Sequence, residues 1–100
     1  MEIKKVEKEK SVQISLIGRL DATTFSELQL VLDEIFKSKI KELVFDFKEL
    51  EYVSSAGLRI FLNAQKLALK NSFKMKLINV NKDVMDVFKI TGFDEFLTIE

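Results

Sequence analysis

Residues 42–62 read ELVFDFKELEYVSSAGLRIFL and join two different patterns of apolar residues. The near-continuous apolar run over 42–47 predicts a largely buried strand, because such runs are typical of parallel sheets that are covered on both faces. A helical spacing follows and predicts a helix to about Lys70, with an apolar stripe that includes Leu58, Phe61, Leu62 and Leu69. The segment Ser54-Ser55-Ala56-Gly57 therefore lies where a strand ends and a helix begins.

The flanking sequence continues this alternation of strands and helices. Strands are predicted at 2–8, 11–17 and 73–79, and the polar residues 8–10 fit a hairpin connection between the first two. A helix is predicted after a capping box formed by Thr24 and Glu27. Another runs from an Asn81 cap to the Thr91-Gly92 stop, and a short last strand closes the chain.

The predicted order of elements is β-β-α-β-α-β-α-β. We expect a single α/β domain over residues 1–100, with a mixed, mostly parallel sheet and an N-terminal antiparallel hairpin.

Composition excludes several classes of function. The 16 basic and 16 acidic residues cancel, which argues against a general nucleic-acid binder and, weakly, against an anionic membrane surface as partner. No apolar run is long enough to span a membrane, and with no cysteine the cytoplasm is the simplest location. The chain also lacks histidine, so a Ser-His-Asp triad or a His/Cys metal site is impossible. We therefore expect that the protein is not an enzyme and that it binds no metal and no cofactor.

The residues at the strand–helix junction allow two interpretations each. Ser55 is a good N-cap residue, and it is also a hydroxyl that a kinase can modify. Gly57 permits either close approach of a partner backbone or close packing of the helix on a strand. Asp21, at the end of another predicted strand of the same sheet, is more simply a helix N-cap than a partner contact, and its loop is expected to flank the Ser55 loop.

Three segments, in order and at fitting spacing, resemble the STAS domain family of anti-sigma factor antagonists. They are Gly18-Arg19-Leu20-Asp21, the stretch from Asp46-Phe47 to Gly57-Leu58, and Val87-Phe88-Lys89-Ile90-Thr91-Gly92-Phe93. The family's phosphorylated serine follows an aspartate in the pattern D-S-[ST]-G-L. By position that serine is Ser55, with Ser54 in place of the aspartate and Ala56 in place of the second hydroxyl residue.

The resemblance implies a partner-switching protein. Its unphosphorylated form would bind an anti-sigma factor with GHKL-type serine kinase activity and so release a sigma factor. Phosphorylation of Ser55, with Ser54 as the second candidate, would weaken that complex. A serine phosphatase would remove the phosphate and restore binding. The partner-binding residues expected on this basis are Asp21, Thr23, Ser54, Ser55, Ala56, Gly57, Leu58 and Arg59. The alternative is a constitutive STAS scaffold, in a lipid-transport or stress-signalling assembly, in which both serines are caps.

Overall fold

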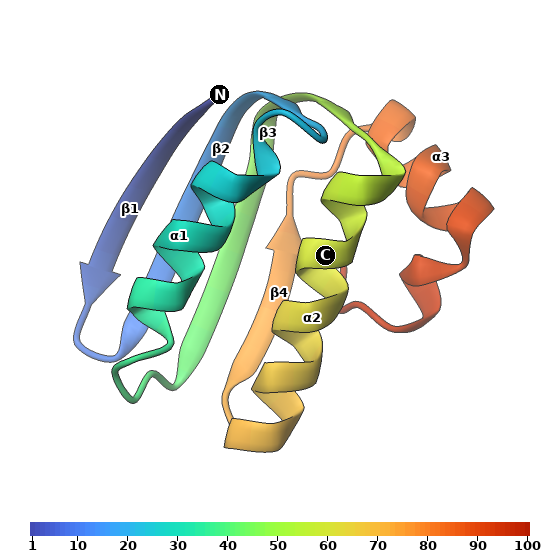
Figure 1. Cartoon of the computed structure of the whole chain (residues 1–100). Coiled ribbons are helices and arrows are strands. Elements are labelled where there is room, and N and C mark those ends of the chain that lie inside the picture. The colour runs from blue at the N-terminus through green and yellow to red at the C-terminus, as the bar shows by residue number, and fades with distance from the viewer.

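A computed structural model describes all residues from Met1 to Glu100 and contains one four-stranded sheet flanked by helices (Figure 1). The sheet has the order β1-β2-β3-β4, with β1 antiparallel to β2 and the other pairs parallel. This confirms the predicted fold class and hairpin. The elements are β1 (Glu2–Lys8), β2 (Ser11–Leu20), α1 (Phe25–Ile35), β3 (Glu42–Val53), α2 (Ser55–Asn71), β4 (Lys74–Ile78), α3 (Lys82–Thr91) and the 3-10 turn η1 (Phe93–Glu95).

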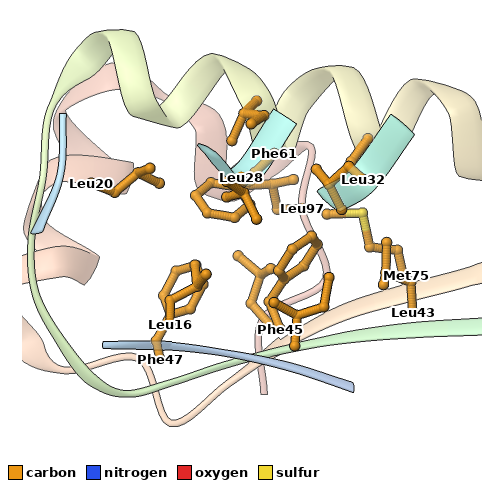
Figure 2. Close-up of a cluster of buried hydrophobic side chains, with 14 of the residues drawn as sticks. Leu16, Leu20, Leu28, Leu32, Leu43, Phe45, Phe47, Phe61, Met75 and Leu97 are labelled. Atoms are coloured by element: carbon orange, nitrogen blue, oxygen red, sulfur yellow. The ribbon is translucent and has the colours of Figure 1, made fainter. Parts of the chain in front are cut away.

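The core lies between the sheet and the helices α1 and α2, which cross one face of it in Figure 1. Figure 2 shows Leu16, Phe45 and Phe47 of the strands pointing toward Phe61 of α2. The rings of Phe45 and Phe61 meet edge to face at 5.0 Å, a favourable aromatic geometry. Helix α3 joins the same core through Phe88, whose ring stacks on Phe47 at 6.2 Å.

The prediction that both faces of the sheet are covered is wrong. Along β3, Leu43, Phe45 and Phe47 point into the core cluster, whereas Val44 is buried outside it, between its strand neighbours Gln13 and Lys76. The apolar run was therefore an alternating strand with one extra apolar residue on its open face. Polar side chains occupy most of that face.

The predicted last strand is reduced to a single bridge between Leu77 and Ile99. The Leu77 N–H donates to the Thr98 carbonyl, and the Glu100 N–H donates to the Leu77 carbonyl, both at 2.9 Å. These residues follow β4 in the parallel sense, but η1 takes up the residues that would have lengthened the strand. The expected stop of α3 at Gly92 is confirmed, since Gly92 adopts the left-handed conformation with φ of 78°.

The stripe predicted on α2 is correct for Leu58 and Phe61 and wrong for Leu69, which is 75% exposed. Its place in the core is taken by Ala64 and Ala68, small residues that let α2 lie close to the sheet. None of the helices is long and apolar enough to cross a bilayer.

Candidate functional site

The ends of β2 and β3 lie side by side and place the two predicted loops together. The strands are parallel, with Leu20 opposite Val53, and the Ser54 N–H donates to the Leu20 carbonyl at 2.9 Å. Asp21 and Ser54 each follow directly after these partners. The expectation that the Asp21 loop flanks the Ser55 loop is therefore confirmed.

The cap of α2 is Ser54 and not Ser55. Ser54 has extended backbone angles, and its Oγ accepts a hydrogen bond from the Gly57 N–H at 3.1 Å. Ser55 is the first helical residue, and its side chain is exposed and makes no hydrogen bond within the protein. The capping role and the exposed hydroxyl thus belong to two different serines.

Gly57 and Leu58 are interior residues, which corrects their assignment to a partner-binding surface. A Cβ atom on Gly57 would lie 2.9 Å from the Leu20 carbonyl oxygen, so this glycine serves close packing of α2 on β2. Leu58 is completely buried, and its N–H donates to the Ser54 carbonyl at 2.9 Å. Neither residue is available to a partner in this fold.

The loop after β2 is held by the Asp21 carboxylate. Its Oδ1 accepts hydrogen bonds from the hydroxyl of Thr23 at 2.7 Å and from the Thr23 N–H at 2.9 Å. These bonds, with that from the hydroxyl as the largest cause, lower the pKa of Asp21 below its ordinary value. Asp21 therefore closes the turn before α1 and does not cap the helix.

The predicted capping box at Thr24 and Glu27 is also wrong. Thr24 is the residue before the first helical turn, but its side chain makes no cap hydrogen bond. Its Oγ1 instead donates to the Arg19 carbonyl at 2.8 Å and accepts from the Asp21 N–H at 3.0 Å. The hydroxyl is used to fold the loop back on β2.

Arg19 and Tyr52 form a pair beside this loop that the sequence patterns did not predict. The guanidinium carbon of Arg19 lies 4.3 Å from the centre of the Tyr52 ring, within the range of a cation–π contact. The Nε atom of Arg19 lies 4.0 Å from Oδ2 of Asp21. The contact depends on the register of β2 and β3, which sets Arg19 opposite Tyr52 and which the spacing of residues in the sequence does not contain.

Ser55 opens onto a surface hollow of about 470 Å³ between α1 and α2, which we call the α1–α2 hollow. Its lining residues are Phe25, Gln29, Ser55, Ala56, Arg59, Ile60 and Asn63. Phe25 is 39% exposed there and gives the hollow an apolar wall. The sequence patterns missed Phe25, Gln29 and Asn63, because only the packing of α1 beside α2 brings them to Ser55.

The electrostatics at Ser55 suit an anion. The start of a helix carries unpaired N–H groups and a partial positive charge of about half an elementary charge. The first turn of α2 has no acidic side chain to neutralise it. Arg59, four residues after Ser55 on the same hollow, adds a full positive charge that makes no ion pair. No cluster of three or more residues with metal-binding side chains is present.

The chain is similar to known proteins over nearly its whole length. The chain is 22% identical over 99 residues to an anti-sigma-B factor antagonist of Staphylococcus aureus, covering 99% of this chain and 92% of the relative. It is 25% identical over 91 residues to that of Bacillus subtilis, covering 91% and 83% of the two chains.

The fold matches solved structures closely. That of the anti-sigma factor antagonist SpoIIAA in its unphosphorylated form has a TM-score of 0.84 at 18% identity, covering 99% of this chain and 88% of the other. An anti-sigma factor antagonist from Mycobacterium paratuberculosis has a TM-score of 0.87 at 17% identity, covering 98% and 83%. The sequence profile of the STAS domain matches residues 2–100. The chain therefore belongs to the STAS domain family.

Proposed function

We propose that this protein is an anti-sigma factor antagonist that is switched by phosphorylation of Ser55. Its unphosphorylated form binds an anti-sigma factor with GHKL-type serine kinase activity in the cytoplasm and releases a sigma factor. The kinase transfers a phosphoryl group from ATP to the Ser55 hydroxyl, and a serine phosphatase removes it. The domain supplies the substrate hydroxyl and the docking surface, while ATP and its Mg²⁺ belong to the partner.

The observation that carries this proposal is the division of labour between Ser54 and Ser55. Ser54 caps α2, so the helix start does not depend on the Ser55 hydroxyl. Ser55 is exposed and free of hydrogen bonds, so a kinase can reach its Oγ without opening the fold. Modification of Ser55 therefore changes the surface and leaves the domain folded.

The size of the electrostatic effect is sufficient for a switch. A phosphate adds roughly −1.5 to −2 charges at pH 7, which the positive end of α2 tolerates. One added like charge about 4 Å from a partner carboxylate costs on the order of 4 kcal/mol near a protein surface. That corresponds to roughly a thousandfold in affinity.

The proposed docking surface consists of exposed and half-buried residues around Ser55. Asp21, Thr23, Ser54, Ala56 and Arg59 remain in it, and Gly57 and Leu58 support it from beneath. The apolar wall of the α1–α2 hollow at Phe25 extends it toward α1.

The test is incubation with candidate GHKL-type anti-sigma factors and ATP, followed by intact-mass measurement. The expected result is the gain of one phosphate in the wild type and in Ser54→Ala, and its loss in Ser55→Ala. Phosphate that persists in Ser55→Ala would move the site to another residue, with Ser54 first to be tested. The binding of the same partners is then compared between the wild type and Ser55→Asp. Equally tight binding of both would favour the constitutive scaffold.

A further inference from the structure

At the other end of the domain β3 begins and α1 and α2 end (Figure 1). A second hollow lies among the residues there. Its volume is about 450 Å³, within the range of ligand-binding hollows. We call it the lysine hollow, and its lining residues are Lys10, Phe36, Lys37, Ser38, Lys39, Ile40, Lys41, Asn71 and Phe73. Four of these nine residues are lysines and none is acidic.

The fold builds the lysine hollow from segments that are far apart in the sequence. The Lys41 N–H donates to the Lys10 carbonyl at 2.8 Å, which fixes the hairpin turn beside the segment that enters β3. The Lys74 N–H donates to the Lys41 carbonyl at 2.9 Å and ties the start of β4 to the same place. The rings of Phe36 and Phe73, 5.8 Å apart, give it an apolar wall that continues into the core. The hollow is therefore held in shape by backbone hydrogen bonds and core packing.

The lysines of the lysine hollow carry more positive charge than the ion pairs and helix ends beside them neutralise. Lys37 pairs with Glu34 at 3.3 Å, whereas Lys10, Lys39 and Lys41 make no ion pair. The C-terminal ends of α1 and α2 attract cations, but each carries only about half a negative charge. Among the lining residues, an excess of about two positive charges remains after these partners are counted, in a chain whose net charge is zero. The acidic neighbours Glu9 and Glu42 are offset by Lys8 and by Lys74, which lies opposite Glu42 in the sheet.

We propose that the lysine hollow docks an acidic segment of a partner protein, with an aromatic or large aliphatic side chain placed between carboxylates. The carboxylates would meet the ammonium groups of the rim, and the apolar side chain would rest on Phe36, Ile40 and Phe73. The shape favours a protruding side chain over a lipid bilayer, because the apolar wall is recessed. Phe73 is only 9% exposed.

This surface is separate from the one at Ser55. Strand β3 runs from Glu42, next to Lys41, to Val53, next to Ser54, so the two surfaces lie at its opposite ends. Both can be occupied at once, and a charge placed on Ser55 should leave docking at the lysine hollow unchanged. Docking at the lysine hollow therefore does not depend on the proposed switch at Ser55.

The experiment measures the fluorescence anisotropy of a fluorescein-labelled peptide, Gly-Glu-Asp-Glu-Phe-Asp-Glu-Gly, on titration with the full chain at low ionic strength. Saturable binding is expected, and the variant Lys39→Glu/Lys41→Glu should weaken it by about tenfold or more. The matched control Lys66→Glu/Lys82→Glu changes the same charge at exposed, unpaired lysines elsewhere and should change the affinity by less than about twofold. Replacing the peptide phenylalanine by glycine, or Ile40 by Ser, should also weaken binding.

Four outcomes would overturn the proposal. The first is the absence of saturable binding, and the second is an equal loss in both charge variants, which would indicate long-range attraction only. The third is retained affinity for the glycine peptide. The fourth is tighter binding to vesicles containing phosphatidylglycerol, lost in Lys39→Glu/Lys41→Glu. Urea unfolding of each variant, with Lys39→Gln/Lys41→Gln as a milder substitute, separates lost docking from lost folding. Wild-type affinity in Ser55→Asp separates this test from that of the switch.

Discussion

Gly57, in the first turn of α2, lies so close to Leu20 at the end of β2 that a Cβ atom on it would come within 2.9 Å of both the carbonyl oxygen and Cγ of Leu20. The same carbonyl oxygen accepts the Ser54 N–H. One residue of β2 thus fixes both the end of β3 and the start of α2. The position of Ser55 relative to Asp21 follows from these two contacts.

Gly57→Ala should destabilise the domain, although alanine is the better helix former. The added methyl group meets a backbone oxygen that cannot turn away, and such overpacking costs about 1–3 kcal/mol. Urea unfolding monitored by circular dichroism measures the loss. An unchanged or increased free energy of unfolding would mean that α2 shifts away from β2 without cost.

Ser54→Ala and Ser55→Ala should differ in stability. Loss of the Ser54 cap should lower the free energy of unfolding by about 1 kcal/mol, whereas Ser54→Asp should retain the cap. Ser55→Ala removes an exposed hydroxyl without a hydrogen bond and should change it by less than about 0.5 kcal/mol. Urea unfolding measures both free energies. Equal losses in the two alanine variants would contradict the assignment of the cap to Ser54.

Ser55→Asp should be at least as stable as the wild type at low ionic strength. The positive end of α2 favours the carboxylate by about 0.3–1 kcal/mol, and Arg59, four residues on, adds about 0.2–0.5 kcal/mol. The gain should shrink in 1 M NaCl, where charges are screened within about 3 Å. A double-mutant cycle with Arg59→Gln isolates the Arg59 contribution. A clear loss of stability in Ser55→Asp would argue that a phosphate at Ser55 acts by unfolding the helix start.

The ionised Asp21 carboxylate should stabilise the fold in a pH-dependent manner. Hydrogen bonds from Thr23 lower the pKa of Asp21 in the folded state. Its contribution is therefore complete above the unfolded pKa of about 3.9 and is lost as the pH falls through the lower folded pKa. The difference in unfolding free energy between the wild type and Asp21→Asn should be constant near neutral pH and shrink below about pH 4.

The cause of the shift has its own test. Thr23→Val removes the hydroxyl donor at nearly constant size, so it should raise the pKa of Asp21 toward its ordinary value. Carbon-detected NMR titration of the carboxyl group reads the change directly. An unaltered pKa in Thr23→Val would assign the shift to a different neighbour.

The sequence predicted the order of elements as far as α3 because each signal was local, whereas the predicted last strand is only a bridge. The spacing of apolar residues located β2, α1, β3 and α2. Because β2 and β3 are parallel, the Asp21 and Ser55 loops then had to lie at the same edge of the sheet. Those inferences need only the spacing of apolar residues and the direction of strands.

The errors came from properties that sequence spacing does not contain. Ser54 and Ser55 are both good caps by residue type, and only the backbone path over Leu20 decides between them. Leu69 follows the helical period, but the core near it is filled by alanines. The hollow at Phe25 depends on how α1 lies beside α2, which no local pattern encodes.

Residues 98–100 protect the edge of the sheet against pairing with a strand of another molecule. They occupy the outer edge of β4, where their two backbone hydrogen bonds to Leu77 satisfy groups that would otherwise recruit a strand from a second molecule. At the opposite edge of the sheet, the charges of the lysines along the exposed strand β1 disfavour such pairing. Removal of residues 98–100 would leave the β4 edge unguarded, so intermolecular strand addition and aggregation at high protein concentration are expected to start there.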